Sequence, residues 1–502
     1  MLPTTYFIIT VLCSLLVWLG HRIQSRRRLK GLPRVGIDPG FLGLRLPAAK
    51  AQFFAHGQEL LEQSYAKYKD TPYIIQTVDN ERLVVPDRYI EELKNLPDTH
   101  ISFKEELLDR FMGKYTKMSA VRGSDIHREV VRGPLTKNIG NLLREMKQEA
   151  EFGMDKTLGE CNAKEFTPVK ASALIFNAIG QITSRIIVDE AFSRDPIWLE
   201  TIMGYTASVA IFSMKMRTIN PILRPAAYWT LQSGRKLRAD IAKVNEFLLP
   251  VIQARQNKIR IDTGDTEGPQ DLLQWVLESA RGKDAEPEQI VLKILFLIVA
   301  AMHTSAITTI HVLYDLCAHP ASMADLCAEA EAEIISGGWT LATLLRLRKM
   351  ESFLKESGRV NSAGVVSFQR LVLKPIRLSN GFTIPENTHI CAASDARSRD
   401  PALYSAPTEF QPLRFYQTDA EIDSAKLFSS VAAGDSWFGF GRQACSGRWY
   451  ASAQIKLVLC LLLLNYEIKF PVGQKERPRN WVKDEKTGPD MEQIILVKKR
   501  GG

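Results

Sequence analysis

The sequence lacks several patterns that mark common classes of protein. Its seven cysteines form no Cys-x-x-Cys pair, which argues against a zinc site or a disulfide scaffold and fits a reducing compartment. No nicotinamide or flavin motif is present. The basic residues are scattered and no nucleic-acid-binding motif accompanies them, so no nucleic acid partner is expected. After residue 50 no linker, repeat or low-complexity tract divides the chain, which predicts one large domain.

An apolar segment precedes that domain. Residues 2–19 carry no charge, and five arginines and lysines follow between positions 22 and 30. A membrane-spanning helix needs about 20 residues, and positive charge on its C-terminal side keeps that side cytoplasmic. We expect a transmembrane anchor over residues 1–20, a basic, proline-containing hinge over 21–50 and the main domain over 51–502. A cleaved signal peptide, the alternative, would need basic residues before the apolar run and small residues at a cleavage site.

Composition agrees with a cytosolic domain beside a membrane. No Asn-x-Ser/Thr glycosylation acceptor occurs, and the net charge is +9, which allows attraction to anionic lipid or to an acidic protein. Helical periodicity dominates the main domain, and Lys349–Val360 also has it. The predicted helices cover residues 53–68, 121–154, 165–192, 198–218, 226–257, 270–281, 287–318 and 446–464. Strands are expected at 73–78 and 82–86 and around 364–392 and 465–499, with a loop at 262–268. The pattern predicts a mainly α fold with a small β portion (α+β).

The most informative segment is the string from Phe438 to Arg448, FGFGRQACSGR, which brackets Cys445 with glycines. A cysteine thiolate that binds haem iron must stay deprotonated, accept hydrogen bonds and let the backbone approach a flat ring. Gly439 and Gly441 allow a positive φ in a tight loop, and Gly447 lets the following helix lie close to the ring. The N-terminal end of that helix favours the anion. A glycine-rich turn around a structural core cysteine is the alternative.

This string resembles the signature of the cytochrome P450 family of haem-thiolate monooxygenases. The resemblance implies the P450 fold, a haem b cofactor and Cys445 as the axial ligand of the iron. Most of the family has a basic residue two positions before the cysteine, whereas here Gln443 holds that place and Arg442 stands one position earlier. We expect Arg442 to contact a haem propionate. The other cofactor-binding residues expected in the loop are Phe438, Gly439, Gly441, Gln443 and Gly447.

The helix expected over residues 287–318 carries the second motif, FLIVAAMHTS at 296–305. Small Ala300 and Ala301 would let a flat cofactor lie against the helix, and the Thr304 hydroxyl would stand beside dioxygen. The family pattern has an acid where His303 stands, and histidine relays protons near neutral pH, so Thr304 and His303 are the expected catalytic residues. Alternatively, Thr304 bonds to the carbonyl four residues earlier in a core helix, and His303 points away. The Ala-Ala-x-His-Thr form resembles fungal members that oxidise terpenoid-derived natural products.

Three further charged residues fit the resemblance. Glu356 and Arg359 lie three apart and so share one helical face, which alone would indicate a solvated surface pair. Arg414 follows in a Pro-Leu-Arg-Phe turn at the family's spacing. The resemblance implies that Glu356, Arg359 and Arg414 form a buried charge network that braces the cysteine loop.

Upstream, the family usually has Trp-x-x-x-Arg for the haem propionates. Arg132 fits the arginine, Arg128 stands in the tryptophan place, and His127 or Arg128 is a substitute donor. A basic, solvated helix face is the alternative. By family position the substrate cavity is expected to be lined by residues 118–119, 207–216, 299–303 and 363–368.

The predicted anchor and the family resemblance together imply a membrane-anchored monooxygenase of the endoplasmic reticulum with a cytosolic catalytic domain. It would insert one atom of dioxygen into a C–H bond of a lipophilic terpenoid or meroterpenoid intermediate of secondary metabolism. Electrons would come from NADPH through an NADPH–cytochrome reductase, since the chain has no flavin or nicotinamide motif. Two alternatives remain: a reductase-independent haem-thiolate isomerase or dehydratase, against which Thr304 speaks, and a non-catalytic anchored haem or lipid binder.

Overall fold

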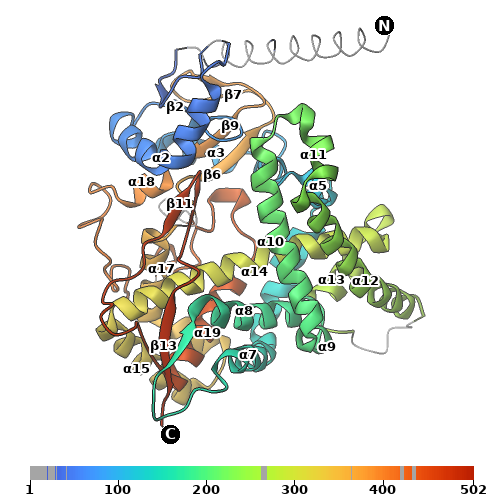
Figure 1. The fold of residues 1–502 in the computed structure, drawn as a ribbon, viewed down its shortest axis with the longest axis vertical. Coiled ribbons are helices and arrows are strands. Elements are labelled where there is room, and N and C mark those ends of the chain that lie inside the picture. The colour runs from blue at the N-terminus through green and yellow to red at the C-terminus, as the bar shows by residue number, and fades with distance from the viewer. Residues whose placement is uncertain are drawn as a thin grey trace.

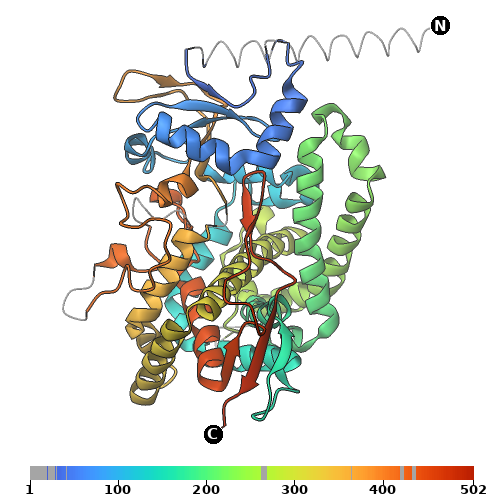
Figure 2. The same ribbon diagram turned by 60° about the vertical axis from the view of Figure 1, so that its left-hand side comes forward.

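The computed structural model describes residues 20, 29, 31–40, 42–261, 268–362, 364–418, 423–431 and 437–501. Residues 1–19 of the expected anchor, most of residues 21–30 of the hinge and nearly all of the expected loop at 262–268 lie outside the described residues. Figures 1 and 2 show a mainly helical molecule in which β2, β6 and β9 lie at one end and the chain finishes at the other. The predicted α+β class is confirmed, because small sheets accompany a much larger set of helices.

Long helices make up most of the described chain. The α-helices are α2 (Leu46–Lys67), α3 (Asp87–Leu93), α4 (Phe103–Arg110), α5 (Gly113–Thr116), α6 (Ile126–Val130), α7 (Thr136–Leu158), α8 (Ala171–Ile187), α9 (Glu190–Arg194), α10 (Pro196–Thr218), α11 (Arg224–Thr230), α12 (Gln232–Ile261), α13 (Leu272–Ser279), α14 (Pro287–Ala318), α15 (Pro320–Gly337), α16 (Leu341–Arg346), α17 (Arg348–Val360), α18 (Ser394–Ser398) and α19 (Arg448–Asn465). Short 3-10 helices are η1 (Met118–Val121), η3 (Pro221–Leu223), η4 (Gly282–Ala285), η5 (Ser424–Lys426) and η6 (Gly441–Gln443), and η2 (Val131–Leu135) is a π-helix.

The strands form a six-stranded sheet and three smaller ones. The large sheet has the order β1-β2-β3-β9-β6-β4, and the others are β10-β13-β5, β11-β12 and β7-β8. Their bounds are β1 (Arg34–Val35), β2 (Tyr73–Gln76), β3 (Glu81–Val84), β4 (Ile101–Ser102), β5 (Thr167–Lys170), β6 (Ser367–Val372), β7 (Ile376–Arg377), β8 (Thr383–Ile384), β9 (His389–Ala392), β10 (Tyr466–Lys469), β11 (Trp481–Lys483), β12 (Lys486–Gly488) and β13 (Ile494–Lys499).

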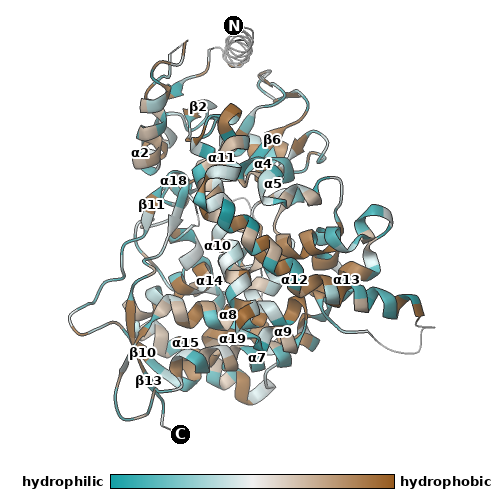
Figure 3. Ribbon diagram, turned by 45° about the vertical axis from the view of Figure 1, so that its right-hand side comes forward, coloured by the Kyte–Doolittle hydropathy of each residue, from teal (hydrophilic) through white to brown (hydrophobic). Residues whose placement is uncertain are grey.

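Helix α14 runs through the middle of the fold (Figure 1). Pro287 stands in its first turn, where a missing N–H costs no helical hydrogen bond, and the helix ends at Ala318, just before Pro320 opens α15. Most of its residues are buried, because α8, α10, α12, α17, α19 and η1 all contact it. Hydrophobic stretches also run along α10, α12 and α13 (Figure 3). The helices around α14 therefore bury most of it and leave an accessible stretch at Ala300 and Thr304 in its middle.

Three predicted helices differ from the structure. The segment expected as one helix over 121–154 is helical only from Ile126 and includes the π-helix η2 before α7. The helix expected over 165–192 begins with strand β5, which pairs with β13 at Val169↔Ile495, and becomes helical only from Ala171. The helix expected over 226–257 is two helices, α11 and α12, because the backbone is extended at Leu231 (ψ 138°). At β5 the pairing with β13 overrides the local periodicity.

Candidate active site

Cys445 lies in a loop between η6 and the start of α19. Its backbone N–H donates to the Phe438 carbonyl (2.7 Å), which closes the loop. The side chain remains accessible although protein atoms surround it on most sides. Burial raises the pKa of the thiol, while the Gly447 backbone N–H and the charge of Arg448 lower it. The loop therefore supplies a donor and a cation that would stabilise a thiolate once a metal replaces the proton.

Gly441 is required by the close approach of another segment. Its φ is +70°, and a Cβ atom there would lie 2.3 Å from the Lys94 carbonyl oxygen. The N–H of Arg442 donates to that same carbonyl (3.0 Å), so the loop is joined to the end of α3. Gly439 has φ +71°, whereas Gly447 has an ordinary φ of −91° and contributes its N–H instead.

Two residues in the middle of α14 are accessible, although most of the helix is buried. Ala300 and Thr304, one turn apart, are exposed, whereas Met302 and Ser305 between and beside them are buried. Since neighbouring helices enclose α14, this accessible stretch indicates an internal space beside the helix. The Thr304 hydroxyl donates to the Ala300 carbonyl (2.8 Å) and still presents its lone pairs to that space. Ala301 is half-buried.

His303 is turned toward α10 and α8. Its Nε2 lies 2.7 Å from the Thr206 hydroxyl, and its ring meets Phe176 edge to face at 5.2 Å between centroids. The Thr206 hydroxyl also lies 2.9 Å from the Met203 carbonyl, and when it donates there Nε2 of His303 is the donor to Thr206. Burial lowers the pKa of His303, which keeps the ring neutral. The structure thus ties His303 to the neighbouring helix through one nitrogen.

Glu356, Arg359 and Arg414 meet as the resemblance implies. The Glu356 carboxylate is fully buried and accepts from Arg359 Nε (2.7 Å) and Nη2 (2.8 Å) and from Arg414 Nε (3.1 Å). Arg359 also donates to the carbonyls of Ser398 and Pro407, both at 2.7 Å. The network therefore fixes the chain that follows β9.

The helix that carries this network touches the start of the cysteine loop. A Cβ atom on Gly358 would lie 3.1 Å from the ring of Trp437, which directly precedes Phe438. Phe438 in turn meets Phe428 edge to face, with 5.2 Å between centroids. The charge network is thus in packing contact with the segment that leads to Cys445.

Of the polar residues expected at the cofactor, Arg132 and Arg442 are exposed, whereas Gln443 is hydrogen-bonded within the protein. Arg132 is exposed and its Nη2 donates to the Arg442 carbonyl (3.1 Å). Arg442 has a side chain 57% exposed and lies 3.7 Å from Asp98. Gln443 bridges to the segment before α4: Nε2 donates to the Ile101 carbonyl (2.7 Å) and Oε1 accepts from the Phe103 N–H (2.5 Å). Gln443 therefore positions the loop.

His127 is a buried donor beside α14. Its ring meets Phe296 edge to face at 4.8 Å, and its Nδ1 has no hydrogen-bond partner among the described residues. Burial, helped by the charge of Lys104, lowers the pKa of His127 to about 4, so the ring is neutral at pH 7. A buried polar nitrogen without a partner indicates a missing ligand atom or water at this place.

Arg370 on β6 is a residue that the sequence analysis missed. Its guanidinium is buried between the rings of Phe368 and Phe103 and donates to the Phe440 carbonyl (3.4 Å). Burial lowers its pKa to about 10, and no carboxylate lies within 4.0 Å of it in the described part of the chain. A buried cation beside the cysteine loop suits an anionic ligand group. In the sequence, the position of Arg370 inside an apolar strand could have indicated a buried cation.

Comparisons with known proteins agree with this site. The model of the family described as Cytochrome P450 matches residues 98–487. Ent-kaurene oxidase P450-4 of Gibberella fujikuroi is 31% identical over 498 residues, covering 97% of this chain and 96% of that protein. Cytochrome P450 monooxygenase paxP of Penicillium paxilli is 31% identical over 468 residues, covering 92% and 89%. The crystal structure of the cytochrome P450DA haem domain shares the fold, with a TM-score of 0.69 at 19% identity over 94% of this chain and 98% of that one.

The chain therefore belongs to the cytochrome P450 family and has the P450 fold. It is a P450 monooxygenase, an enzyme that binds haem through a cysteine thiolate and uses dioxygen, a lipophilic substrate and a reductase. The residues present fit such a group. Cys445 is accessible, Ala300 offers a small accessible surface, and His127 and Arg370 provide a buried donor and a buried cation.

Proposed function

We propose that this protein is a membrane-anchored monooxygenase that holds haem through Cys445 and oxidises a lipophilic terpenoid or meroterpenoid of secondary metabolism. The accessible Cys445 thiol, held in a loop that only glycine at position 441 permits, carries the proposal. Ent-kaurene, named in one relative, is a diterpene hydrocarbon, which supports a terpenoid substrate. The reaction puts one oxygen atom into a C–H bond and releases the other as water, using two electrons and two protons.

Haem held by Cys445 would supply the site at which dioxygen binds and is reduced. Thr304 is the proposed hydroxyl that holds a water on the accessible face of α14, because its lone pairs remain available beside its bond to the Ala300 carbonyl. His303 is the second proposed catalytic residue. With Nε2 engaged by Thr206, its Nδ1 is the nitrogen that can accept a proton from such a water. An accessible Thr304 favours this oxygen chemistry over a reductase-independent isomerase.

The haem propionates are proposed to meet His127, Arg132 and Arg370, with Arg442 at the exposed edge. His127 supports this assignment through its buried nitrogen without a partner among the described residues, and Arg370 through its buried charge. Glu356, Arg359 and Arg414 act at a distance by bracing the segment before Cys445.

The basic surface beside the cysteine loop favours an acidic protein as the electron donor. Arg442, with its side chain 57% exposed, and Arg132 lie together beside the cysteine loop, where an electron would enter. Positive charge at such a place steers a negatively charged partner. We infer that this partner is an NADPH–cytochrome reductase.

An apolar end of the molecule supports membrane contact. Ile222, Leu223 and Trp229 on η3 and α11 are 60–65% exposed, and Leu42 and Leu44 before α2 are exposed as well. Figures 1 and 2 place α11 at the same end as the N-terminal part of the described chain. Exposed aliphatic and tryptophan side chains suit the membrane interface. Helices α10 and α14 are also long and apolar enough to span a membrane, but half or more of each is buried in the protein, so they are weak evidence for a span.

Two measurements test the proposal. The reduced protein with carbon monoxide should show the red-shifted band of thiolate ligation, and Cys445→Ser should abolish it. A histidine-type band in folded wild-type protein would refute the ligand assignment. Expression with a reductase in a host that makes diterpene scaffolds, including ent-kaurene, should give oxidised products that require NADPH. Products that persist without NADPH and reductase would refute the monooxygenase mechanism.

A further inference from the structure

Lys486 is a largely buried cation on the β11–β12 hairpin. It opens β12 opposite Lys483, and its backbone also bridges to Gly364 in the segment after α17. The side chain reaches the ring of Phe111 at the end of α4, with 5.9 Å between Nζ and the ring centroid. Among the described residues no carboxylate lies within 4.0 Å of Nζ, and no hydrogen bond engages it. The fold therefore holds this ammonium group without a counterion of its own among these residues.

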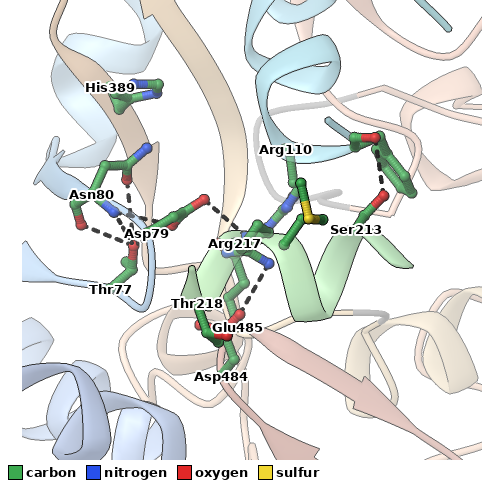
Figure 4. A network of polar contacts seen from close by, with 12 residues as sticks. Thr77, Asp79, Asn80, Arg110, Ser213, Arg217, Thr218, His389, Asp484 and Glu485 are labelled. Atoms are coloured by element: carbon green, nitrogen blue, oxygen red, sulfur yellow. Dashed lines mark hydrogen bonds and ion pairs between the residues drawn. The ribbon is translucent and has the colours of Figure 1, made fainter. Parts of the chain in front are cut away.

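The acidic residues around Lys486 are engaged by another cation (Figure 4). Arg217 of α10 is 2% exposed and contacts Asp79 Oδ2 (2.8 Å from Nε), Asp484 Oδ2 (3.1 Å from Nη1) and Glu485 Oε1 (3.1 Å from Nη2). Asp79 lies in the turn between β2 and β3, and the other two acids directly precede Lys486 in the hairpin turn. These carboxylates are therefore already paired, and none of them is the partner of the lysine.

Arg110 of α4 is a second cation with an unused donor. It contacts Glu485 through Nη2, and it directly precedes Phe111 in the chain. Its Nε is buried and has no hydrogen-bond partner among the described residues. A buried N–H group without a partner indicates a missing ligand atom or water. The end of α4 and the hairpin therefore offer two donors to an acceptor, Nε of Arg110 and Nζ of Lys486.

The electrostatic surroundings of the two donors are positive. Burial, followed by the charges of Arg110 and Arg217, lowers the pKa of Lys486 to about 8, and nearby acids offset only part of this. Burial, followed by the charges of Arg82 and Arg217, lowers the pKa of Arg110 to about 9, although Arg82 is itself paired with Glu106 at 2.7 Å. Both donors keep their protons at pH 7. An anion beside them would relieve the repulsion between them.

The end of α4 adjoins the core around α14. Phe111 packs against the hydrophobic cluster that contains Met118 of η1 and Met302 of α14. Helix η1 also contacts α14 directly, and the Ser213 hydroxyl of α10 donates to the Phe111 carbonyl (2.9 Å). A ligand whose polar end lies at the two donors would therefore extend its apolar part toward the accessible face of α14 at Thr304.

We propose that Lys486 and Arg110 bind a carboxylate at the end of the internal space beside α14, and that the substrate of this enzyme is a terpenoid acid. A carboxylate accepts strong, charge-assisted hydrogen bonds from an ammonium and a guanidinium, and it supplies the counterion that Lys486 lacks. Fixing one end of the hydrocarbon body also fixes which carbon lies nearest the haem held by Cys445. This inference rests on the proposed function and deepens it, because it names the polar group that the lipophilic substrate carries.

Fatty acids that carry an imidazole at the far end test this site without turnover. In the haem-loaded full chain, the imidazole would bind the iron and shift the Soret band, and in a series of increasing chain length one carboxylate would reach the two cations. At that length the acid should bind the wild type about 10- to 100-fold more tightly than its methyl ester, the value of one charge-assisted hydrogen bond. Lys486→Met should remove this preference and leave the Kd of the ester unchanged.

Matched variants keep the test decisive. Lys483→Met removes the exposed lysine opposite Lys486 in the same hairpin and should retain the preference for the acid. Lys486→Gln should also lose the preference, and it decides the outcome if Lys486→Met does not retain haem. Equal affinity for acid and ester in the wild type at every chain length, or a preference that survives the Lys486 variants, would overturn the proposal.

The two proposals fail separately. Oxidation of neutral terpenoids together with equal affinities for acid and ester would overturn the carboxylate site and leave the proposed function standing. Failure of terpenoid oxidation would leave the acid preference intact, because the imidazole probes report binding alone.

Discussion

Replacing Glu356 by alanine is expected to prevent stable haem incorporation. The carboxylate is fully buried and receives two hydrogen bonds from Arg359, a bifurcated one from Arg414 and one from the Gln411 backbone N–H (2.8 Å). Its removal leaves two guanidiniums without their shared anion in the interior. Breaking a buried pair costs about 3–5 kcal/mol. Proteins are stable by only about 5–15 kcal/mol, so this loss is a large fraction of the total.

The assay compares haem content per polypeptide and the midpoint of guanidinium denaturation among wild type, Glu356→Gln and Glu356→Ala. The glutamine variant keeps the shape and some hydrogen bonds, so it should lie between the other two. Glu151→Ala is the control, because Glu151 makes an exposed i,i+4 pair with Lys147 (2.5 Å) that is worth about 0.5 kcal/mol. A soluble Glu356→Ala protein with full haem content and an unchanged midpoint would refute the bracing role.

Three other variants have defined outcomes. Thr206→Val removes the acceptor that sets the His303 tautomer, so ¹⁵N-histidine NMR should show Nε2–H in wild type and a tautomer mixture in the variant; an unchanged spectrum would contradict the assignment. Arg370→Met should speed haem loss to apomyoglobin about 10- to 100-fold, the value of one charge-assisted hydrogen bond, whereas an unchanged rate would exclude a propionate contact. Burial raises the pKa of Glu106, but Arg82 outweighs it and lowers that pKa to about 2. Stability from Glu106 is therefore complete above the unfolded pKa of about 4.5 and falls by about 3 kcal/mol as pH drops from 4.5 to 2. Glu106→Gln should flatten this acid limb in denaturation curves, and a variant with the wild-type acid slope would contradict the pairing.

Local chemistry made part of the site predictable from the sequence. Gly441 was predictable because a positive φ and a close backbone approach both select glycine, and the structure supplies the neighbour in Lys94. Glu356 and Arg359 share a helical face by their spacing alone. Their union with Arg414 came from the family resemblance, since no local rule joins positions so far apart.

The remaining features depend on partners that periodicity does not reveal. Strand β5 forms because β13, more than 320 residues later, offers it a pairing edge. Arg217 contacts Asp79 near the beginning of the chain and Asp484 near its end. In the sequence alone, each of these acids has the pattern of an ordinary surface charge. Arg370 was missed for a related reason: its importance lies in being buried with no carboxylate within 4.0 Å in the described structure, which only three-dimensional placement shows.

The ties of the cysteine loop also bear on the order in which the protein assembles. The Lys94 carbonyl, the Ile101 carbonyl and the Phe103 N–H hold Arg442 and Gln443, some 340 positions later in the chain. Contacts of such long sequence separation form slowly, because a long loop must close first. During synthesis Cys445 emerges late and meets a segment that was made long before. We therefore expect cofactor capture to be a late event, so a nascent chain truncated before Arg442 would fold its early helices yet hold no haem.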